Sequence, residues 1–418
     1  MRNLFTGRMT PKKLIIALIA GLTAFMMLAG AVSAADTTTG TPPIVEVPDR
    51  KFILEGVPIT FKNAPAAIGG RTMLPLRELV VALGVPNDDD HIIYKRVPNG
   101  EQYIAVMYGE TRIELTIGKA EAYINGEKLT LDTAPVIYKN STYIPLWFVA
   151  EALGKKVVWV GQTNTVLIVD KETFDAVREV FIRSNEAGKN VTKNRMKINV
   201  DGDITVGTIE SSLKMNLDTA VDRESKAIYV RSVFEILGFN MIQESYYKDN
   251  VYYTSDILNG GWKKKTYTPE EYDLIFESNS EAVRMEDDET LLACLKIEES
   301  ENEDELVLAG NTNFMDIFTE SYMQQAGSLG LDQNITQPEW YSVKFVFDKD
   351  TYMLKTLLMG MYGEREENGV LTTIDMKVTT EYSDFNGDFE ITVPEEVAKN
   401  AVEDDSIGPG ASGASYSF

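Results

Sequence analysis

The reactive side chains of this sequence are isolated from one another. His91, the only histidine of the 418 residues, follows Asp88–Asp90 in a predicted loop. Cys294, the only cysteine, lies in the apolar stretch Leu291–Leu295, which is typical of a buried helix face. A hydroxyl or thiol nucleophile needs a neighbouring base, and a copper site needs several imidazole ligands. We therefore expect no catalytic residue, no metal site and no cofactor, and a protein that is not an enzyme.

Aromatic residues gather between positions 246 and 267 and could bind a ligand rather than react. They are Tyr246, Tyr247, Tyr252, Tyr253, Trp262 and Tyr267. On an exposed strand face such rings stack on sugars or peptidoglycan, whereas the alternation of side chains along a strand would place some of them in the core. Both interpretations stay open, and the candidate ligand-binding residues are Tyr252, Tyr253 and Trp262.

Alternating apolar residues in the second half of the chain predict strands with one buried face. The residues concerned are Met196, Ile198, Met215, Leu217, Phe345 and Phe347. Such a face is ordinarily the core of a sheet, and the alternative is the lining of an apolar ligand cavity.

A sequence block that recurs 70 residues later predicts the elements of a first domain, residues 50–170. Arg71–Gly84 and Ser141–Gly154 align without a gap, and each contains a strand that ends in Leu-Pro-Leu or Ile-Pro-Leu. Apolar residues then recur at helical spacing, and a glycine closes each helix. The pair Asn125-Gly126 predicts a hairpin turn. Together these signals predict a twisted sheet wrapped on two short helices.

This block resembles the copper amine oxidase N-terminal, or stalk, domain in its Asn125–Leu129 and Ala134–Ile137 segments and in its Leu/Ile-Pro-Leu…Ala-Leu-Gly helices. The resemblance implies a wall-side binding or spacer module, without the copper chemistry of the family's name. Its helices usually pair Arg with Glu four positions apart. Here the first copy has Arg77 and the second has Trp147 with Glu151. Arg77 and Trp147 are candidate partner-binding residues, and we expect Arg77 and Glu151 to compensate each other across the copies.

The second domain, residues 171–400, resembles the lipoprotein-carrier-like fold of Gram-positive surface proteins. The matching segments are an early run of strands, Tyr252-Tyr253 followed by Gly261-Trp262, Phe347–Tyr352 and Phe389–Pro394. The resemblance implies a leading helix and a curved antiparallel half-barrel sheet packed on helices, with an apolar cavity for acyl chains or lipoproteins. The whole chain is thus expected to be α+β, with a duplicated small sheet-plus-helix stalk domain before the half-barrel.

The first 35 residues predict export from the cell. Four basic residues precede the apolar stretch Leu14–Val32, and small residues at positions 32–35 suit cleavage of a signal peptide. The apolar stretch is long enough to span a bilayer, so an uncleaved leader is the alternative and the one route to the membrane. Because no cysteine stands at the cleavage site, we expect an unlipidated protein that is secreted or associated with the cell surface. Residues 36–49 predict a linker and residues 401–418 a disordered tail.

Charge excludes nucleic acid as a partner. The formal net charge is −24, and loss of the leader with its four basic residues makes it −28, whereas nucleic-acid binding needs a basic surface. We expect a cell-surface binding protein whose second domain takes a lipid, a lipopeptide or a partner protein. The alternative is a structural module that binds the cell wall through peptidoglycan, without a small-molecule ligand. Neither an oligomeric state nor a complete calcium-binding loop follows from the sequence.

Overall fold

The computed structural model describes residues 43–98, 100–236, 239–257, 259–280, 288–310, 338–367 and 369–408. Within these ranges the chain divides into two compact units, of which the first ends at Ala176 and the second begins at Val177. The predicted signal peptide lies outside the described residues, as do the first part of the predicted linker and the end of the predicted tail.

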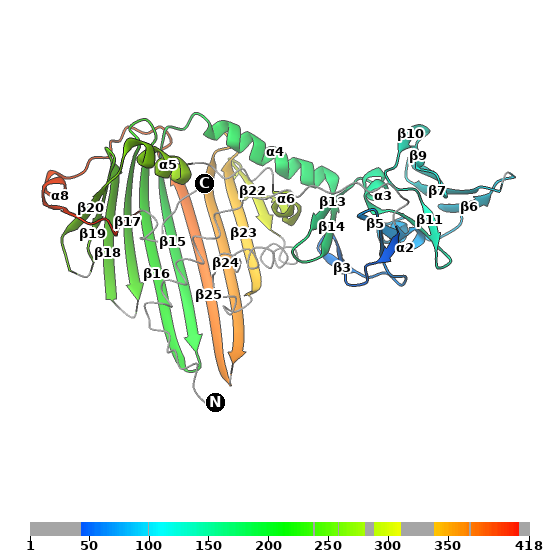
Figure 1. Ribbon diagram of the computed structural model, residues 1–418, viewed down its shortest axis with the longest axis horizontal. Coiled ribbons are helices and arrows are strands. Elements are labelled where there is room, and N and C mark those ends of the chain that lie inside the picture. Colours follow the sequence, from blue (N-terminus) through cyan, green and yellow to red (C-terminus); the bar gives the residue numbers. More distant parts are fainter. Residues whose placement is uncertain are drawn as a thin grey trace. The chain divides into compact units, whose positions relative to one another are not determined.

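Three small sheets build the N-terminal unit (Figure 1). Their strand orders are β1-β4-β5-β12-β11, β10-β9-β8-β7-β6 and β13-β14-β2-β3. The strands are β1 Ile44–Glu46, β2 Lys51–Leu54, β3 Val57–Ile59, β4 Ala66–Ile68, β5 Arg71–Pro75, β6 Ile92–Arg96, β7 Gln102–Tyr108, β8 Thr111–Thr116, β9 Glu121–Ile124, β10 Glu127–Thr130, β11 Val136–Tyr138, β12 Ser141–Pro145, β13 Lys155–Val160 and β14 Thr165–Asp170. The helices are α2 Leu76–Ala82 and α3 Leu146–Ala152.

Equivalent elements of the N-terminal unit recur 70 residues apart, with β4, β5 and α2 corresponding to β11, β12 and α3. The equivalent strands β5 and β12 pair antiparallel, and Leu74 lies opposite Ile144, the residue 70 positions later. Pairing of two equivalent residues is the arrangement that a local twofold axis produces. Each helix accordingly contacts both β5 and β12.

The two short helices begin and end where the sequence predicts. Each follows a proline at the end of a strand, Pro75 or Pro145, whose missing N–H costs nothing at a helix start. Gly84 and Gly154 follow the last turns with φ of +99° and +73°, a conformation that glycine adopts without a Cβ clash. Their apolar faces are buried in one core cluster with β7 and β8, so the periodicity in the sequence reports this core.

A single twelve-stranded sheet forms the body of the C-terminal unit (Figure 1). Its order is β21-β22-β23-β24-β25-β15-β16-β17-β18-β19-β20-β26, and every neighbouring pair is antiparallel except β20 with β26. The strands are β15 Lys193–Val206, β16 Ile209–Asp222, β17 Ala227–Ile236, β18 Phe239–Lys248, β19 Val251–Ser255, β20 Trp262–Thr266, β21 Leu295–Glu298, β22 Glu305–Gly310, β23 Pro338–Asp348, β24 Leu354–Glu367, β25 Val370–Ser383 and β26 Val402–Glu403. The helices are α4 Lys171–Gly188, which contains the boundary between the units, α5 Pro269–Ser280, α6 Glu289–Cys294 and α8 Glu395–Asn400.

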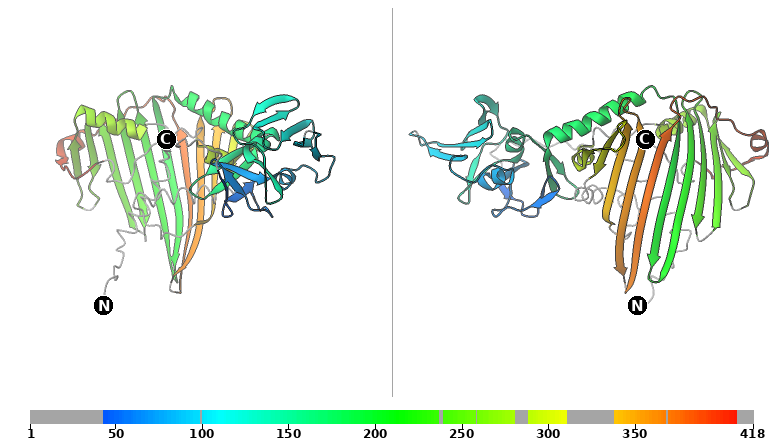
Figure 2. Two further views of the ribbon diagram at one scale, coloured as in Figure 1. Left: turned by 45° about the vertical axis from the view of Figure 1, so that its right-hand side comes forward. Right: turned by 180° about the vertical axis from the view of Figure 1, so that it is seen from behind.

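The large sheet curls into a half-barrel, which is visible from front and back in Figures 1 and 2. Helix α5 lies at one end of the strands, and the tips of the hairpins β15–β16 and β24–β25 lie at the other (Figure 1). The expected α+β class with a curved antiparallel sheet is therefore confirmed. The long strands twist and coil because each hairpin adds the right-handed twist of its strands to the next.

Two segments expected to lack structure contain strands. Ile44–Glu46, within the predicted linker, forms β1 and pairs with β4. Val402–Glu403, within the predicted tail, forms β26 and pairs with β20. A strand of two or three residues is too short to show an alternation of apolar and polar side chains in the sequence. Such a strand forms only because it can pair with the edge of an existing sheet.

Candidate functional site

One face of the large sheet is apolar across seven neighbouring strands, and we call it the apolar face. Residues paired in the register lie side by side on the same face of a sheet. One such row runs from β22 to β17, and all its members are buried: Leu308, Phe345, Leu357, Thr380, Ile198, Leu217 and Ser232. Residues of the opposite parity on β15, such as Lys197 and Asp201, are exposed, so the other face meets solvent.

The next row of the apolar face is rich in methionine. It contains Val343, Met359, Val378, Val200, Met215, Phe234 and Met241, from β23 to β18. Met359, Met215 and Met241 are half-buried, and Met359 and Met215 pack against a buried cluster that includes Ile198 and Val200. In the following row, a Cβ on Gly202 would approach the Met376 Cγ to 3.0 Å. Flexible thioethers around a tightly packed centre adapt to apolar partners of irregular shape.

Two buried hydroxyls of the apolar face have no hydrogen-bond partner within the described part of the chain. Thr380 is fully buried and Thr219 is 4% exposed, and the Oγ1 of each is unpaired. Thr380 lies beside Ile198 and Thr219 beside Met196 in the register of the sheet. A buried hydroxyl without a partner costs about 1–3 kcal/mol, so these two groups are unfavourable for the fold as they stand. The sequence gives no signal for these threonines, because only the register brings them onto this face.

Helix α4 covers one part of the apolar face. The ring of Phe181 packs edge-on against Phe345 at 5.2 Å and against Phe347 at 5.8 Å between ring centroids. Phe345 and Phe347 are 2% and 1% exposed. These two candidates for a cavity lining are therefore ordinary core, as the first interpretation of the alternating residues holds.

The apolar face reaches solvent at the tip of the hairpin β15–β16. Val206 lies on the same face of β15 as Ile198 and Val200, because all three have even residue numbers. It pairs with Ile209 on β16. Val206 is 43% exposed and Ile209 is 69% exposed. Aliphatic side chains on this face therefore change from buried to exposed along β15, and exposed apolar residues of this kind are typical of interaction surfaces.

Strand alternation separates the aromatic candidates onto opposite faces of the sheet. Tyr252 is 4% exposed and lies opposite Tyr247, which stacks on Tyr272 of α5 with centroids 4.6 Å apart. Burial raises the pKa of the Tyr247 hydroxyl, which has no hydrogen-bond partner among the described residues. Tyr252 is thus buried on the apolar side, which is the core interpretation of the aromatic residues rather than the exposed one.

Tyr253 and Trp262 lie on the face opposite to Tyr252, and both are half-buried. The ring of Tyr246 lies between Tyr229, at 4.9 Å, and Trp262, at 5.8 Å. The Tyr229 hydroxyl donates to the Glu244 carboxylate at 2.8 Å, and burial together with this carboxylate raises the Tyr229 pKa. The sequence does not single out Tyr229 or Glu244, because they come from strands that only the register joins.

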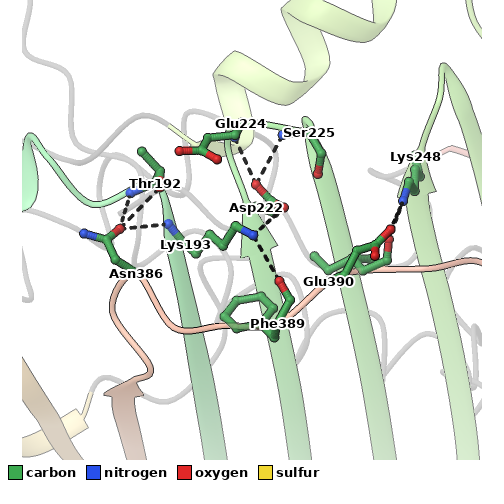
Figure 3. A network of polar contacts seen from close by, with 10 residues as sticks. Thr192, Lys193, Asp222, Glu224, Ser225, Lys248, Asn386, Phe389 and Glu390 are labelled. Atoms are coloured by element: carbon green, nitrogen blue, oxygen red, sulfur yellow. Dashed lines mark hydrogen bonds and ion pairs between the residues drawn. The ribbon is translucent and has the colours of Figure 1, made fainter.

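A segment after β25, residues 384–394, crosses the strand ends on this solvent side of the sheet (Figure 3). Lys193 donates to the Phe389 carbonyl at 3.0 Å and lies 3.4 Å from the Asp222 carboxylate. Lys248 donates to the Ile391 carbonyl at 2.6 Å. Burial alone would raise the pKa of Asp222, but hydrogen bonds from Ser225 and the Lys193 ammonium outweigh it and lower that pKa. This cluster anchors the segment and leaves no open site.

The two candidates of the N-terminal unit occupy equivalent positions and have different partners. Arg77 donates to Asn87 at 2.9 Å and lies 3.7 Å from Asp89, both in its own copy. Trp147 is half-buried, and its Nε1 donates to Asp132 at 3.3 Å. The expected compensation between Arg77 and Glu151 is not the arrangement found, because the guanidinium turns to its own loop.

His91 and Cys294 occupy surroundings that differ in burial. His91 is half-buried, and its Nδ1 lies 2.7 Å from the Asp88 carboxylate, whose pKa this hydrogen bond lowers. Cys294 is buried in α6 as the sequence predicts, and burial raises the pKa of its thiol. Within the described ranges, no group of three or more His, Cys, Asp or Glu side chains is placed to hold a metal ion. None of the helices described there has both the length and the apolar composition to cross a membrane.

Comparison with protein families separates the two halves of the chain. A model described as the copper amine oxidase N-terminal domain matches residues 53–168. A second model, DUF6612, a family of unknown function, matches residues 176–402, more than half of the chain. The chain belongs to this DUF6612 family, and the preceding residues 53–168 are similar to the copper amine oxidase N-terminal domain. A search of curated proteins finds no match.

Solved structures similar to the chain include lipoproteins. Lipoprotein LppX of Mycobacterium tuberculosis is 10% identical, with a TM-score of 0.27, over 52% of this chain and 99% of that one. LprF from Mycobacterium bovis is 9% identical, with a TM-score of 0.26, over 53% and 97%. A putative outer membrane lipoprotein-sorting protein domain from Vibrio parahaemolyticus is 10% identical, with a TM-score of 0.17, over 55% and 97%. TM-scores this low support no functional argument, which must come from the chain's own residues.

Proposed function

We propose that the DUF6612 portion of the chain binds an apolar molecule, a lipid or the acyl chain of a lipopeptide, on the apolar face. The observation that carries the proposal is the continuity of this face, from the buried row around Ile198 and Leu217 to the exposed Val206 and Ile209. A hydrophobic surface that ends in exposed aliphatic residues is typical of interaction sites.

The side chains of the apolar face limit the classes of ligand that it would bind. The half-buried Met215, Met241 and Met359 suit flexible acyl chains, which have no fixed shape. The unpaired hydroxyls of Thr219 and Thr380 suit a ligand with an ester or amide carbonyl, which accepts hydrogen bonds. The protein acts in this proposal by binding, without a catalytic step.

The N-terminal unit is proposed to be a duplicated stalk, residues 50–170, that spaces the binding domain from the cell wall or contacts it. The recurrence of elements 70 residues apart and the pairing of Leu74 with Ile144 support a duplication. Arg77 and Trp147 remain the residues proposed for a wall-side contact, because they differ between two otherwise equivalent positions. Export by a cleaved signal peptide and a location at the cell surface belong to the same proposal.

The test is native mass spectrometry of the full-length protein purified from its host without detergent, with extraction and identification of bound lipids. We expect a lipid-bound species. The variant Met215→Lys places a charge on the apolar face and is expected to hold about tenfold less lipid, because a charge is costly to bury beside an acyl chain. The matched control is Asn216→Lys, which adds the same charge to the same strand on the opposite, exposed face.

Two results would contradict the proposal: a wild-type protein that carries no lipid, or a Met215→Lys variant that retains as much as Asn216→Lys. If the lipid-free protein were instead captured by purified peptidoglycan, and deletion of residues 50–170 abolished capture, the structural wall-binding alternative would hold.

A further inference from the structure

A hollow lies on the solvent face of the sheet, at the ends of β18, β19 and β20 opposite α5. Its volume is about 410 Å³, within the range of sites for small ligands. Its walls include Met241, Glu244, Ser255, Asp256, Gly261 and Trp262. Glu244, Ser255 and Trp262 belong to the solvent face of the sheet, and Met241 is the one wall residue that the hollow shares with the named rows of the apolar face.

Strands β18, β19 and β20 place the polar residues Glu244 and Ser255 next to the aromatic residue Trp262. Ser255 pairs with Trp262 in the register, and the Glu244 N–H donates to the Ser255 Oγ at 2.9 Å. Arg231 of β17 pairs with Glu244 from the other side. The side chains therefore form one row in which a carboxylate, a hydroxyl and an indole are adjacent.

Asp256, Ile257, Gly260 and Gly261, from the turn between β19 and β20, contribute to the wall of the hollow. Gly260 and Gly261 have φ of +73° and +82°, so glycine is the residue that fits both positions. The Asp256 carboxylate accepts hydrogen bonds from the backbone N–H and side-chain amide of Asn259, each at 3.0 Å, and lies 3.5 Å from the Lys263 ammonium. Asp256 thus fixes the turn, and its charge is balanced.

The remaining polar groups of the hollow offer both acceptors and donors. Tyr229 donates to the Oε1 of Glu244, and Oε2 has no partner among the described residues. Ser255 Oγ accepts from the backbone, so its own proton is available for an acceptor. The Nε1–H of Trp262 makes no hydrogen bond within the described ranges. A ligand that fills this site must both donate to a carboxylate and accept from a hydroxyl or an indole.

We propose that this hollow binds a neutral pyranose sugar, with one sugar face stacked on the Trp262 ring and a hydroxyl donating to Glu244. Vicinal hydroxyls both donate and accept, and the apolar face of a pyranose ring stacks on indole. An organic cation fits less well, because Arg231 and Lys263 flank the acidic groups and the site offers donors that a cation does not use. Glu244, Ser255 and Trp262, which carry this proposal, lie outside the named rows of the apolar face proposed to bind lipid.

The experiment is isothermal titration of the full-length protein with chitotriose, maltotriose and, as the cationic probe, choline chloride. We expect saturable binding of at least one trisaccharide with a dissociation constant of about 1 mM. Trp262→Ala should weaken it by about tenfold, which corresponds to ~1.4 kcal/mol. Glu244→Gln keeps the shape and removes the charged acceptor, and should weaken binding severalfold.

Matched controls are Trp159→Ala, which removes an exposed tryptophan of the other unit, and Glu381→Gln, which removes an exposed carboxylate of β25. Both should bind as the wild type does. Should Trp262→Ala fail to fold, Trp262→Phe, with its smaller ring, and Glu244→Gln decide the question by the same titration. The proposal is overturned if neither trisaccharide saturates, if the site variants bind like the controls, or if choline alone binds. Bound lipid in the same samples would leave the proposed function standing in each of these cases.

Discussion

Asp222 is a buried carboxylate that the C-terminal unit uses to order its strand ends. Its Oδ1 accepts backbone hydrogen bonds from Glu224 at 3.0 Å and Ser225 at 3.2 Å, and its Oδ2 faces the Lys193 ammonium (Figure 3). The side chain is 4% exposed, so these partners replace water almost completely. Charge-assisted hydrogen bonds of this kind are stronger than neutral ones, and they hold the β16–β17 turn closed.

Asp222→Asn should reduce the free energy of unfolding by about 1–3 kcal/mol at pH 7, because the half-buried Lys193 ammonium loses its counter-charge. The folded state lowers the pKa of Asp222, and the unfolded chain has a pKa of about 3.9. The stabilisation is therefore present above about pH 4 and is lost as the pH falls towards the lower, folded-state pKa. Urea unfolding of both proteins at neutral and acidic pH measures this difference, which should narrow in acid. A constant difference at all pH values would contradict the role of the charge, and Asp203→Asn, an exposed aspartate of β15, serves as the control.

Burial that depends on neighbours in the sequence can be predicted more securely than burial that depends on distant strands. The burial of Cys294 could be predicted because its apolar sequence neighbours indicate a helix in the core. Tyr252 and Tyr253 look alike in the sequence, yet one is core and the other half-buried, because alternation sorts neighbours without saying which face is inside. Glu244 and Thr380 become candidates only through pairing with distant strands, to which no local pattern points.

The 384–394 segment is irregular, and it is bonded to strands that are far from it in the sequence. It makes no strand, and it bonds to Lys193 and Lys248, residues almost 200 and more than 140 positions earlier. Ile391 is 4% exposed and packs with Ala220 and Ala227 on the solvent side of the sheet. The sequence resemblance marks this segment, but its course depends on lysines of two separate strands.

Ile391→Ala should lower the free energy of unfolding by about 2–4 kcal/mol, since it removes a buried side chain and leaves a cavity above two alanines that cannot fill it. Denaturant unfolding followed by circular dichroism provides the measurement. Thr392→Ala changes the exposed neighbouring residue and should alter stability by less than about 0.5 kcal/mol. Equal effects of the two substitutions would show that the segment does not pack as a fixed cover.

Elements with strong local signals were predictable, and those that depend on pairing were not. The helices after Pro75 and Pro145 form as expected because their start, apolar stripe and terminal glycine lie within ten residues. Strands β1 and β26 escape prediction because each exists only as an addition to an edge. The order of twelve strands likewise follows from long-range pairing, for which one sequence provides no direct signal.

At the scale of the whole molecule, helix α4 decides where the chain can be divided. The boundary between the units falls at Val177, inside this helix. Phe174, before the boundary, is buried with the Lys156 ammonium 5.2 Å from its ring, and Phe181, after it, packs on Phe345 and Phe347. A cut at the end of the helix would therefore remove a buried ring from the C-terminal unit, although the family match itself begins at residue 176.

Two fragments that differ only by α4 test this. Residues 171–408 retain Phe181, whereas residues 189–408 expose Phe345 and Phe347 to water. The shorter fragment should be less stable by about 3–5 kcal/mol, the usual cost of losing a buried aromatic ring, and should bind a hydrophobic dye that the longer fragment binds weakly. Urea unfolding and dye fluorescence measure the two effects.

In the full-length chain, Phe181→Ala should reproduce the loss of stability while Ile182→Ala, at an exposed neighbouring position, should not. If both fragments unfold at the same urea concentration, α4 belongs energetically to the stalk alone, and the apolar face must be closed by other contacts.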